Sequence, residues 1–216
     1  MSKVFENCLA VFDLDGTISQ TDLFSVPAHI QVMSEMGYPV KTEAEIKSTY
    51  GMVQKDYLNA LIGDYSSDNA MTYLRRVTAV EQELISTEGR PFDGATEMLK
   101  ELRASGIKTA ICSNASYRYI KMVMDAYKMF DLFDYFQPVT KGLSKIDTLG
   151  ILLEHSKAQK AVMVGDTAFD MQAAEGNNIP FIGCLYGFRP EQLTVCEHKV
   201  NSACELTEKI KTLLKD

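Results

Sequence analysis

The segment AVFDLDGTISQTD, residues 10–22, places Asp13 and Asp15 two residues apart behind an apolar run. Consecutive residues of a strand point to opposite faces, so these two carboxylates point the same way. Neighbouring carboxylates repel each other, and a divalent cation offsets that repulsion; Mg²⁺ takes few carboxylates together with waters and phosphate oxygens. The pair indicates a metal-assisted site, although an Asp-x-Asp-Gly turn that merely ends a strand is an equally ordinary interpretation.

A second acidic group lies in VGDTAFD, residues 164–170, where another apolar run ends at Asp166 and Asp170 follows four residues later. We expect Asp166 at a strand end and Asp170 in the first turn of the next helix, so that both can face the same crevice as the first pair. Asp166 alone could be a helix cap. Four carboxylates in one crevice, however, predict a metal site.

Two further positions could bind an anion. Ser113 and Asn114 follow a third apolar run, and a hydroxyl beside the N–H groups of a helix N-terminus suits a phosphate. A helix cap is the alternative for this pair. Lys145 is expected at a helix start, where a positive charge is unfavourable unless it has an anionic partner. Lys141 competes for the same role, and we prefer Lys145 because a helix begins there.

The elements that must position these residues alternate along the chain. Apolar, strand-like runs at residues 8–15, 107–114, 160–166 and 179–187 are separated by segments with helical spacing of apolar residues. Such alternation predicts an α/β fold with a doubly wound, mainly parallel sheet covered on both faces. Ligands of these sheets bind at the carboxyl ends of the strands, which is where the polar residues lie.

Residues 18–87 interrupt this alternation, because they contain no strand-like run. Their pattern predicts helices at about 22–36, 42–49, 53–62 and 68–87. We therefore expect a small all-helical cap domain, residues 18–87, inserted into an α/β core formed by residues 1–17 and 88–216.

Composition argues against several classes of protein. The chain has 22 Lys and Arg against 29 Asp and Glu, a net charge of −7, and no basic cluster to neutralise nucleic-acid phosphates. Its five scattered cysteines indicate neither a zinc site nor a disulfide framework. No apolar stretch approaches the ~20 residues of a membrane span, and the start MSKVFENC lacks the apolar core of a signal peptide. We expect a cytoplasmic protein with no nucleic-acid or membrane partner.

The motif order DxDGT, a strand ending in Ser, a Lys and then GDTxxD resembles the haloacid dehalogenase-like (HAD) hydrolase superfamily. The phosphoglycolate phosphatase-like branch, which has a helical cap inserted after the first motif, is the most similar. The segments RPFDGATEMLKELRASGIKTAICSN and AAEGNNIPFIGCLYGF also match that branch. The resemblance implies a HAD-like Rossmannoid core and a Mg²⁺-dependent phosphatase, a phosphoric monoester hydrolase. Its substrate would be a small phosphorylated metabolite, phosphoglycolate-like or a sugar phosphate.

The resemblance also implies roles for individual residues. Asp13 would be the nucleophile that forms an aspartyl-phosphate, and Asp15 the general acid and base. The implied metal ligands are Asp13, Asp15 through its backbone carbonyl, Asp166 and Asp170, the last as ligand or outer support. The implied phosphate-binding residues are Ser113, Asn114 and Lys145.

The cap would carry substrate choice. The segment TYGMVQKDY, residues 49–57, resembles the family's specificity loop, with Gly51 at its turn and Gln54 or Lys55 able to reach the leaving group. A solvated helix face is the alternative for Gln54 and Lys55. Gln20 is a departure, since relatives commonly carry there an acidic residue that assists the acid/base; Asp22 could substitute for it.

Other functions remain open from the sequence. A phosphomutase of the same superfamily would move phosphate instead of releasing it, and Thr17 disfavours that reading because mutase relatives usually carry a smaller or aliphatic residue there. A non-catalytic protein that binds a phosphate ligand is the alternative from another class. Either a monomer or a homodimer is compatible with the chain.

Overall fold

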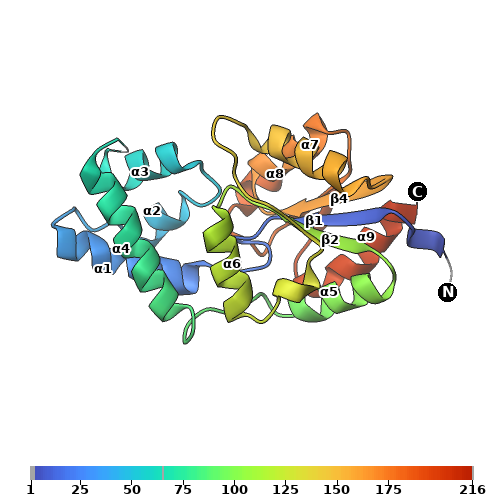
Figure 1. Ribbon diagram of the computed structural model, residues 1–216, viewed down its shortest axis with the longest axis horizontal. Coiled ribbons are helices and arrows are strands. Elements are labelled where there is room, and N and C mark those ends of the chain that lie inside the picture. Colours follow the sequence, from blue (N-terminus) through green and yellow to red (C-terminus); the bar gives the residue numbers. More distant parts are fainter. Residues whose placement is uncertain (1–2, 65, 216) are drawn as a thin grey trace. The chain divides into compact units, whose positions relative to one another are not determined.

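The structure, a computed structural model, describes residues 3–64 and 66–215 (Figure 1). The chain divides into two compact units. One comprises the residues up to Ser19 together with those from Pro91 onward, and the other comprises Gln20–Arg90.

The first unit is built on a six-stranded, all-parallel sheet with the order β3-β2-β1-β4-β5-β6. Its strands are β1 (Cys8–Phe12), β2 (Lys108–Cys112), β3 (Tyr135–Gln137), β4 (Lys160–Gly165), β5 (Phe181–Cys184) and β6 (His198–Val200). The predicted α/β fold with a parallel sheet is therefore confirmed. The four apolar runs became β1, β2, β4 and β5. The edge strands β3 and β6 escape the sequence pattern because they are three residues long and partly exposed.

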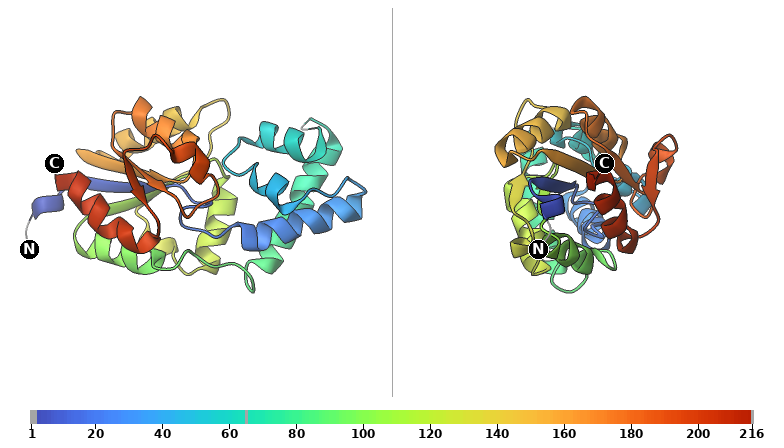
Figure 2. Two further views of the ribbon diagram at one scale, coloured as in Figure 1. Left: turned by 180° about the vertical axis from the view of Figure 1, so that it is seen from behind. Right: turned by 90° about the vertical axis from the view of Figure 1, so that its right-hand side faces the viewer.

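Helices cover both faces of this sheet. Helices α7 (Lys145–Ser156) and α8 (Ala168–Gly176) lie on one face, and α5 (Ala95–Ala104) and α9 (Leu206–Lys215) on the other (Figures 1 and 2). Helix α6 (Tyr117–Ala126) follows β2, and short 3-10 turns occur at Lys3–Phe5, Phe130–Leu132, Pro190–Leu193 and Ala203–Glu205.

Central strand β1 packs toward α7 and α8 through its odd-numbered residues. Leu9 and Val11 are fully buried in one cluster with Leu149 of α7 and Ala173 of α8. Because side chains alternate along a strand, the next odd residue, Asp13, continues this series toward the same two helices. The apolar packing of β1 thereby sets the direction in which its terminal carboxylate points.

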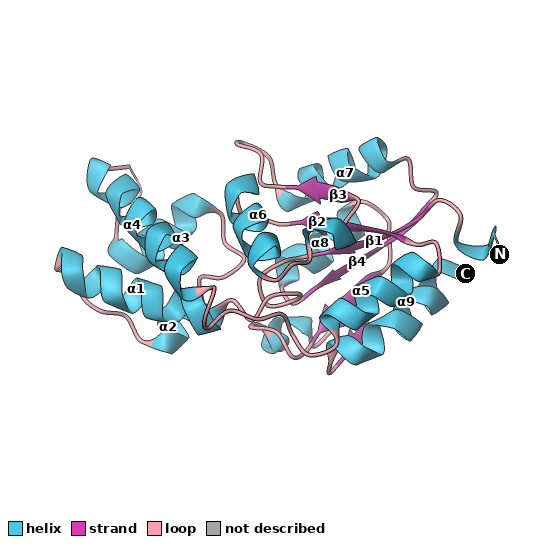
Figure 3. Ribbon diagram, turned by 60° about the horizontal axis from the view of Figure 1, so that its bottom comes forward, coloured by secondary structure: helices cyan, strands magenta, loops and turns pink. Residues whose placement is uncertain are grey.

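The second unit contains helices α1 (Asp22–Met36), α2 (Glu43–Lys47), α3 (Gln54–Ile62) and α4 (Asp68–Leu84), and no strand among its described residues (Figure 3). Buried His29 of α1 joins three of these helices. The hydroxyl of Tyr57 in α3 lies 2.7 Å from His29 Nε2, and the hydroxyl of Tyr73 in α4 lies 2.5 Å from His29 Nδ1. A polar cluster thus ties α1, α3 and α4 together inside the buried interior of this unit.

The helical unit begins two residues after the expected boundary at residue 18 and ends three residues after the expected boundary at residue 87. Ser19 forms isolated β-bridges with Asp15 and Pro91, which hold it in the α/β unit. The N–H of Gln20 donates to the carbonyl of Arg90 at 3.1 Å inside the helical unit. Among the described residues, no helix has the length and apolar character needed to cross a membrane.

Candidate active site

Adjacent strands deliver the first two carboxylates to one edge of the sheet. Asp13 directly follows β1, and its N–H donates to the carbonyl of Val164 in β4 at 2.9 Å. Asp166 directly follows β4. Since β1 and β4 are parallel neighbours, both aspartates lie at the carboxyl ends of their strands, as in other open α/β sheets.

A tight turn follows Asp15 and packs directly against Asp166. The carbonyl of Leu14 accepts three backbone hydrogen bonds from residues 17–19, and Gly16 has a φ of 81°. A Cβ at Gly16 would lie 2.3 Å from Asp166 Oδ2. Glycine is required here both for the left-handed backbone and for this close approach.

Asp170 is oriented by the start of its own helix. It lies three residues after Thr167 in a capping box, and its Oδ2 accepts from the Thr167 N–H at 3.0 Å and the Thr167 hydroxyl at 2.7 Å. The absence of a side chain at Gly165 makes room for it, because a Cβ there would lie 2.3 Å from Asp170 Cγ. The other oxygen, Oδ1, is left to face the site.

Asp166 is held by two loops. The backbone N–H of Phe188 donates to its Oδ2 at 2.7 Å, and the hydroxyl of Thr17 donates to its Oδ1 at 3.4 Å. The hydroxyl of Tyr186 donates to the carbonyl of Thr17 at 3.0 Å. The loop after β5 therefore orients an acidic side chain of the site.

Lys145 is the cation of this site. It is the first residue of α7, its side chain is 5% exposed, and its Nζ lies 2.6 Å from Asp13 Oδ1 and 2.5 Å from Asp170 Oδ1. Lys141 is exposed in the preceding loop. The unfavourable helix-start position of Lys145 is offset by these two carboxylates. Of the two candidate lysines, the structure places Lys145 beside Asp13.

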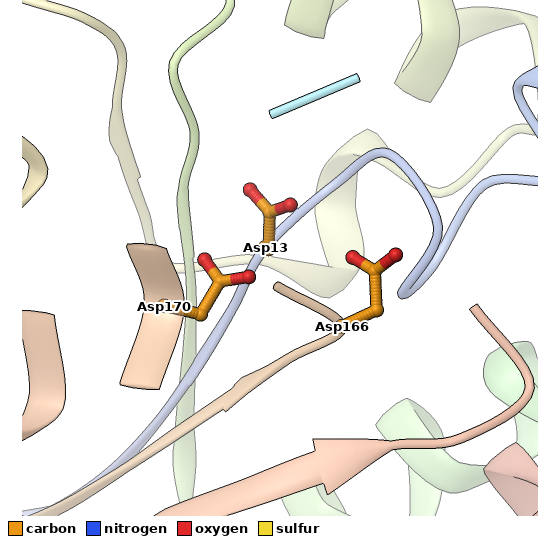
Figure 4. Close-up of side chains that lie close together, drawn as sticks. All are labelled: Asp13, Asp166 and Asp170. Carbon is orange, nitrogen blue, oxygen red and sulfur yellow. The ribbon is translucent and has the colours of Figure 1, made fainter. Parts of the chain in front are cut away.

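The carboxylates of Asp13, Asp166 and Asp170 form a buried group, with one oxygen from each lying within 4.8 Å of the others (Figure 4). Burial raises the pKa of Asp13 to about 7, and repulsion from Asp170 and Asp15 adds to the rise, whereas Lys145 opposes it. Burial also raises the pKa of Asp166 well above its usual range. For Lys145, burial alone would lower the pKa, but Asp13 and Asp170 outweigh it and raise the pKa.

These charges fit a hard divalent cation. One lysine faces three buried carboxylates, so the ionised group carries excess negative charge that burial makes unfavourable. Carboxylate oxygens are the donors that Mg²⁺ prefers. Among the residues that the structure describes, this group of three does not include the side chain of Asp15.

Asp15 and Ser113 lie at the same edge of the sheet. The carboxylate of Asp15 is half-buried and its Oδ1 accepts a hydrogen bond from Tyr119 Oη at 3.2 Å. Phe12 pairs with Ile111, so β1 and β2 end in register and bring Ser113 to the edge where Asp13 lies. The buried Ser113 hydroxyl accepts from the Ala115 N–H at 3.1 Å, and Asn114 beside it is half-buried.

The candidate specificity residues belong to the helical unit. Gly51 has a φ of 82° in the turn before α3, and exposed Gln54 and Lys55 begin that helix. Gln54 Nε2 lies 4.0 Å from Met71 Sδ of α4. Asp22, considered as a substitute for an acidic residue at position 20, forms an ion pair with Lys47 at 2.8 Å.

Sequence reasoning missed Tyr119, because no local pattern links it to a carboxylate 104 residues earlier. It also missed Thr167, which carried a usable signal. Thr followed three residues later by an acidic side chain at a helix start is typical of a capping box.

Comparison with known proteins places this geometry in a family. A model of the haloacid dehalogenase-like hydrolases matches residues 10–184. The "Probable phosphatase IndB" of Dickeya dadantii is 27% identical over 206 residues, covering 89% of this chain and 87% of that protein. A phosphoglycolate phosphatase of Agrobacterium fabrum is 28% identical over 193 residues, covering 83% and 81%.

Solved structures share the fold. A protein from Haemophilus somnus, described as a "predicted phosphoglycolate phosphatase", superposes with a TM-score of 0.83 at 16% identity, over 93% of this chain and 96% of that one. A "predicted phosphatase" from Clostridium acetobutylicum gives a TM-score of 0.77 at 23% identity, over 95% and 98%. The family match spans most of the chain and contains every acidic residue of the site. The resemblance drawn from the motifs is thus confirmed, and the chain belongs to the haloacid dehalogenase-like hydrolases.

Proposed function

We propose that this hydrolase is a Mg²⁺-dependent phosphatase that hydrolyses a small phosphorylated metabolite through an aspartyl-phosphate. The observation that carries the proposal is the buried group of Asp13, Asp166 and Asp170 with Lys145 between two of them. Three buried carboxylates against one lysine are unfavourable for a merely structural purpose, but they suit a cation that meets a phosphate.

The residues divide the work as follows. Asp13 attacks phosphorus and forms the aspartyl-phosphate while the ester oxygen leaves, and Asp15 donates a proton to that oxygen. Asp15 then takes a proton from a water molecule, whose oxygen attacks phosphorus, releases inorganic phosphate and restores Asp13. Lys145 holds Oδ1 of Asp13 in a fixed position and, with Ser113, contributes positive charge and hydrogen bonds to the phosphoryl oxygens.

The metal would be held by the carboxylates of Asp13, Asp166 and Asp170, with the main-chain carbonyl of Asp15 as a further ligand. When bound, Mg²⁺ neutralises charge between the anionic nucleophile and the anionic phosphate. The capping contacts on Asp170 and the Phe188 contact on Asp166 keep these two side chains in place before the metal arrives.

The α/β unit is the catalytic core in this proposal, and Gln20–Arg90 is a cap that selects the substrate. Phosphoglycolate-like compounds and sugar phosphates are the first substrates to examine, because several relatives are named phosphoglycolate phosphatases. Asn114 would add an amide contact to the phosphate, and Gly51, Gln54 and Lys55 would contribute to choice of the leaving group.

Phosphate release from a panel of 2-phosphoglycolate, sugar phosphates and p-nitrophenyl phosphate tests the proposal, with Mg²⁺ or with EDTA. Wild type should release phosphate only with Mg²⁺, and Asp13→Asn should abolish release because it removes the nucleophilic charge while keeping the shape. Asp131→Asn, which makes the same change at an exposed position, is the matched control. Isomerisation of a sugar phosphate without release would favour a mutase. Binding without turnover would favour a non-catalytic protein.

A further inference from the structure

Helix α6 contacts the loop that carries Asp15 at both of its ends. Near its start, Tyr119 Oη donates to Asp15 Oδ1 at 3.2 Å. At its end, Tyr127 Oη lies 2.9 Å from the hydroxyl of Ser19. The helix lies beside the carboxyl ends of β1 and β2 (Figures 1 and 3), so two phenols from one rigid element reach one catalytic loop.

The backbone that carries Tyr119 is well anchored. Tyr119 is the third residue of α6, and its N–H donates to the side chain of the N-cap residue Ser116 at 3.3 Å. The ring is half-buried, which restricts its movement. A functional side chain supported by a capped helix is positioned more accurately than one on a free loop.

A carboxyl group that gives and takes a proton benefits from such a contact. The phenol donates to Oδ1 of Asp15, which restrains the plane of the carboxyl group. A hydrogen bond is directional, whereas apolar packing is not, so the phenol holds the orientation of the carboxyl group better than an apolar neighbour would.

We propose that Tyr119 is a positioning residue, whose phenol orients the carboxyl group of Asp15 for proton transfer to the leaving oxygen. This inference rests on the proposed phosphatase function. Removing the phenol should leave Asp15 present but misoriented. Loss of a hydrogen bond to a charged group, or displacement of a reacting group by about 1 Å, slows a reaction by roughly 10-fold to 100-fold.

The test compares two phosphate esters that differ in their need for an acid. p-Nitrophenolate leaves without a proton, whereas the alkoxide of benzyl phosphate requires one. Tyr119→Phe should lower kcat/KM for benzyl phosphate roughly 10-fold to 100-fold and change kcat/KM for p-nitrophenyl phosphate by less than about threefold. The ratio kcat/KM is the right quantity, because it reports the step in which the leaving group departs and not the later hydrolysis.

Another tyrosine of the same helix provides a matched control. Tyr117 is 47% exposed, and its ring packs edge-on against Phe136. Tyr117→Phe should leave the ratio of the two esters unchanged. Thermal unfolding of both variants verifies that the fold is intact.

The Asp15→Asn variant distinguishes a failure of the proposed function from a failure of the positioning role of Tyr119. It should lower benzyl phosphate hydrolysis more than p-nitrophenyl phosphate hydrolysis, as a lost general acid does. If wild type hydrolyses neither ester, the proposed function fails. If wild type and Asp15→Asn behave as expected but Tyr119→Phe retains the wild-type ratio, or lowers both esters equally, the positioning role alone is overturned.

Discussion

Replacing Lys145 with methionine tests the electrostatic account of the site directly. Methionine has a similar length and no charge, so Asp13 and Asp170 lose their common partner while packing is largely kept. We expect the metal-free α/β unit to lose much of its stability at pH 8. The reason is that buried carboxylates without a cation are strongly unfavourable.

The magnitude follows from the burial of the three groups. The side chains of Lys145, Asp13 and Asp170 are 5%, 4% and 0% exposed, so solvent screens their interaction little. Breaking a buried ion pair by removing one partner costs about 3–5 kcal/mol in the free energy of unfolding. For a chain of this size, that loss lowers Tm by roughly 6–20 °C. The deficit should shrink at pH 6, because protonation neutralises the unpaired carboxylates.

Thermal and urea unfolding, each in EDTA and in Mg²⁺, measure this loss. Lys141→Met is the matched control, since it makes the same substitution four residues earlier at an exposed position and should change stability by less than about 0.5 kcal/mol. Mg²⁺ should raise Tm more in Lys145→Met than in wild type, because the ammonium group that repels the cation and neutralises the carboxylates is then absent. Equal stability of the two variants in EDTA at pH 8 would refute the reasoning.

Three further outcomes are expected. Burial raises the pKa of Asp13 from 3.8 to about 7 and also raises the pKa of Asp166, so the metal-free α/β unit should become less stable as pH rises from about 4 to 7. Urea unfolding in EDTA measures this dependence of stability on pH, which Asp13→Asn should reduce; stability that rises with pH would contradict the raised pKa values. Burial lowers the pKa of His29 from 6.5 to about 3, so the helical unit should lose stability as pH falls below about 6.5. Its hydrogen exchange, corrected for the intrinsic effect of pH, should then speed up, and a pH dependence that persists in His29→Gln would exclude His29 as the cause. Gly165→Ala places a Cβ 2.3 Å from Asp170 Cγ and should weaken Mg²⁺ binding by roughly 10-fold to 100-fold in calorimetry, whereas unchanged affinity would show that Asp170 does not bind the metal.

Much of the fold could be predicted from local pattern. The strands β1, β2, β4 and β5 are buried apolar runs, and the four helices of Gln20–Arg90 lie close to their predicted positions. Burial and helical periodicity are properties of neighbouring residues, so the sequence displays them directly. The same is true of the strand-end positions of Asp13 and Asp166, and of the capped helix start that places Asp170.

Long-range geometry was decided only by the tertiary structure. The competition between Lys141 and Lys145 is resolved by the docking of α7, which buries one lysine beside Asp13 and leaves the other exposed. Likewise, the exclusion of the Asp15 side chain from the group of three carboxylates depends on where the turn at Gly16 points it.

The contact of Tyr119 with Asp15 shows the same limit most clearly. No local sequence pattern around either side chain predicts their contact, because 104 positions separate the two residues. Their meeting requires the parallel register of β1 with β2 and the placement of α6 after the end of β2. The sequence by itself determined which groups with chemical potential lie at the strand ends. Only the packing of helices on the sheet decided which of them touch, because distances of a few ångströms between remote residues depend on the whole core.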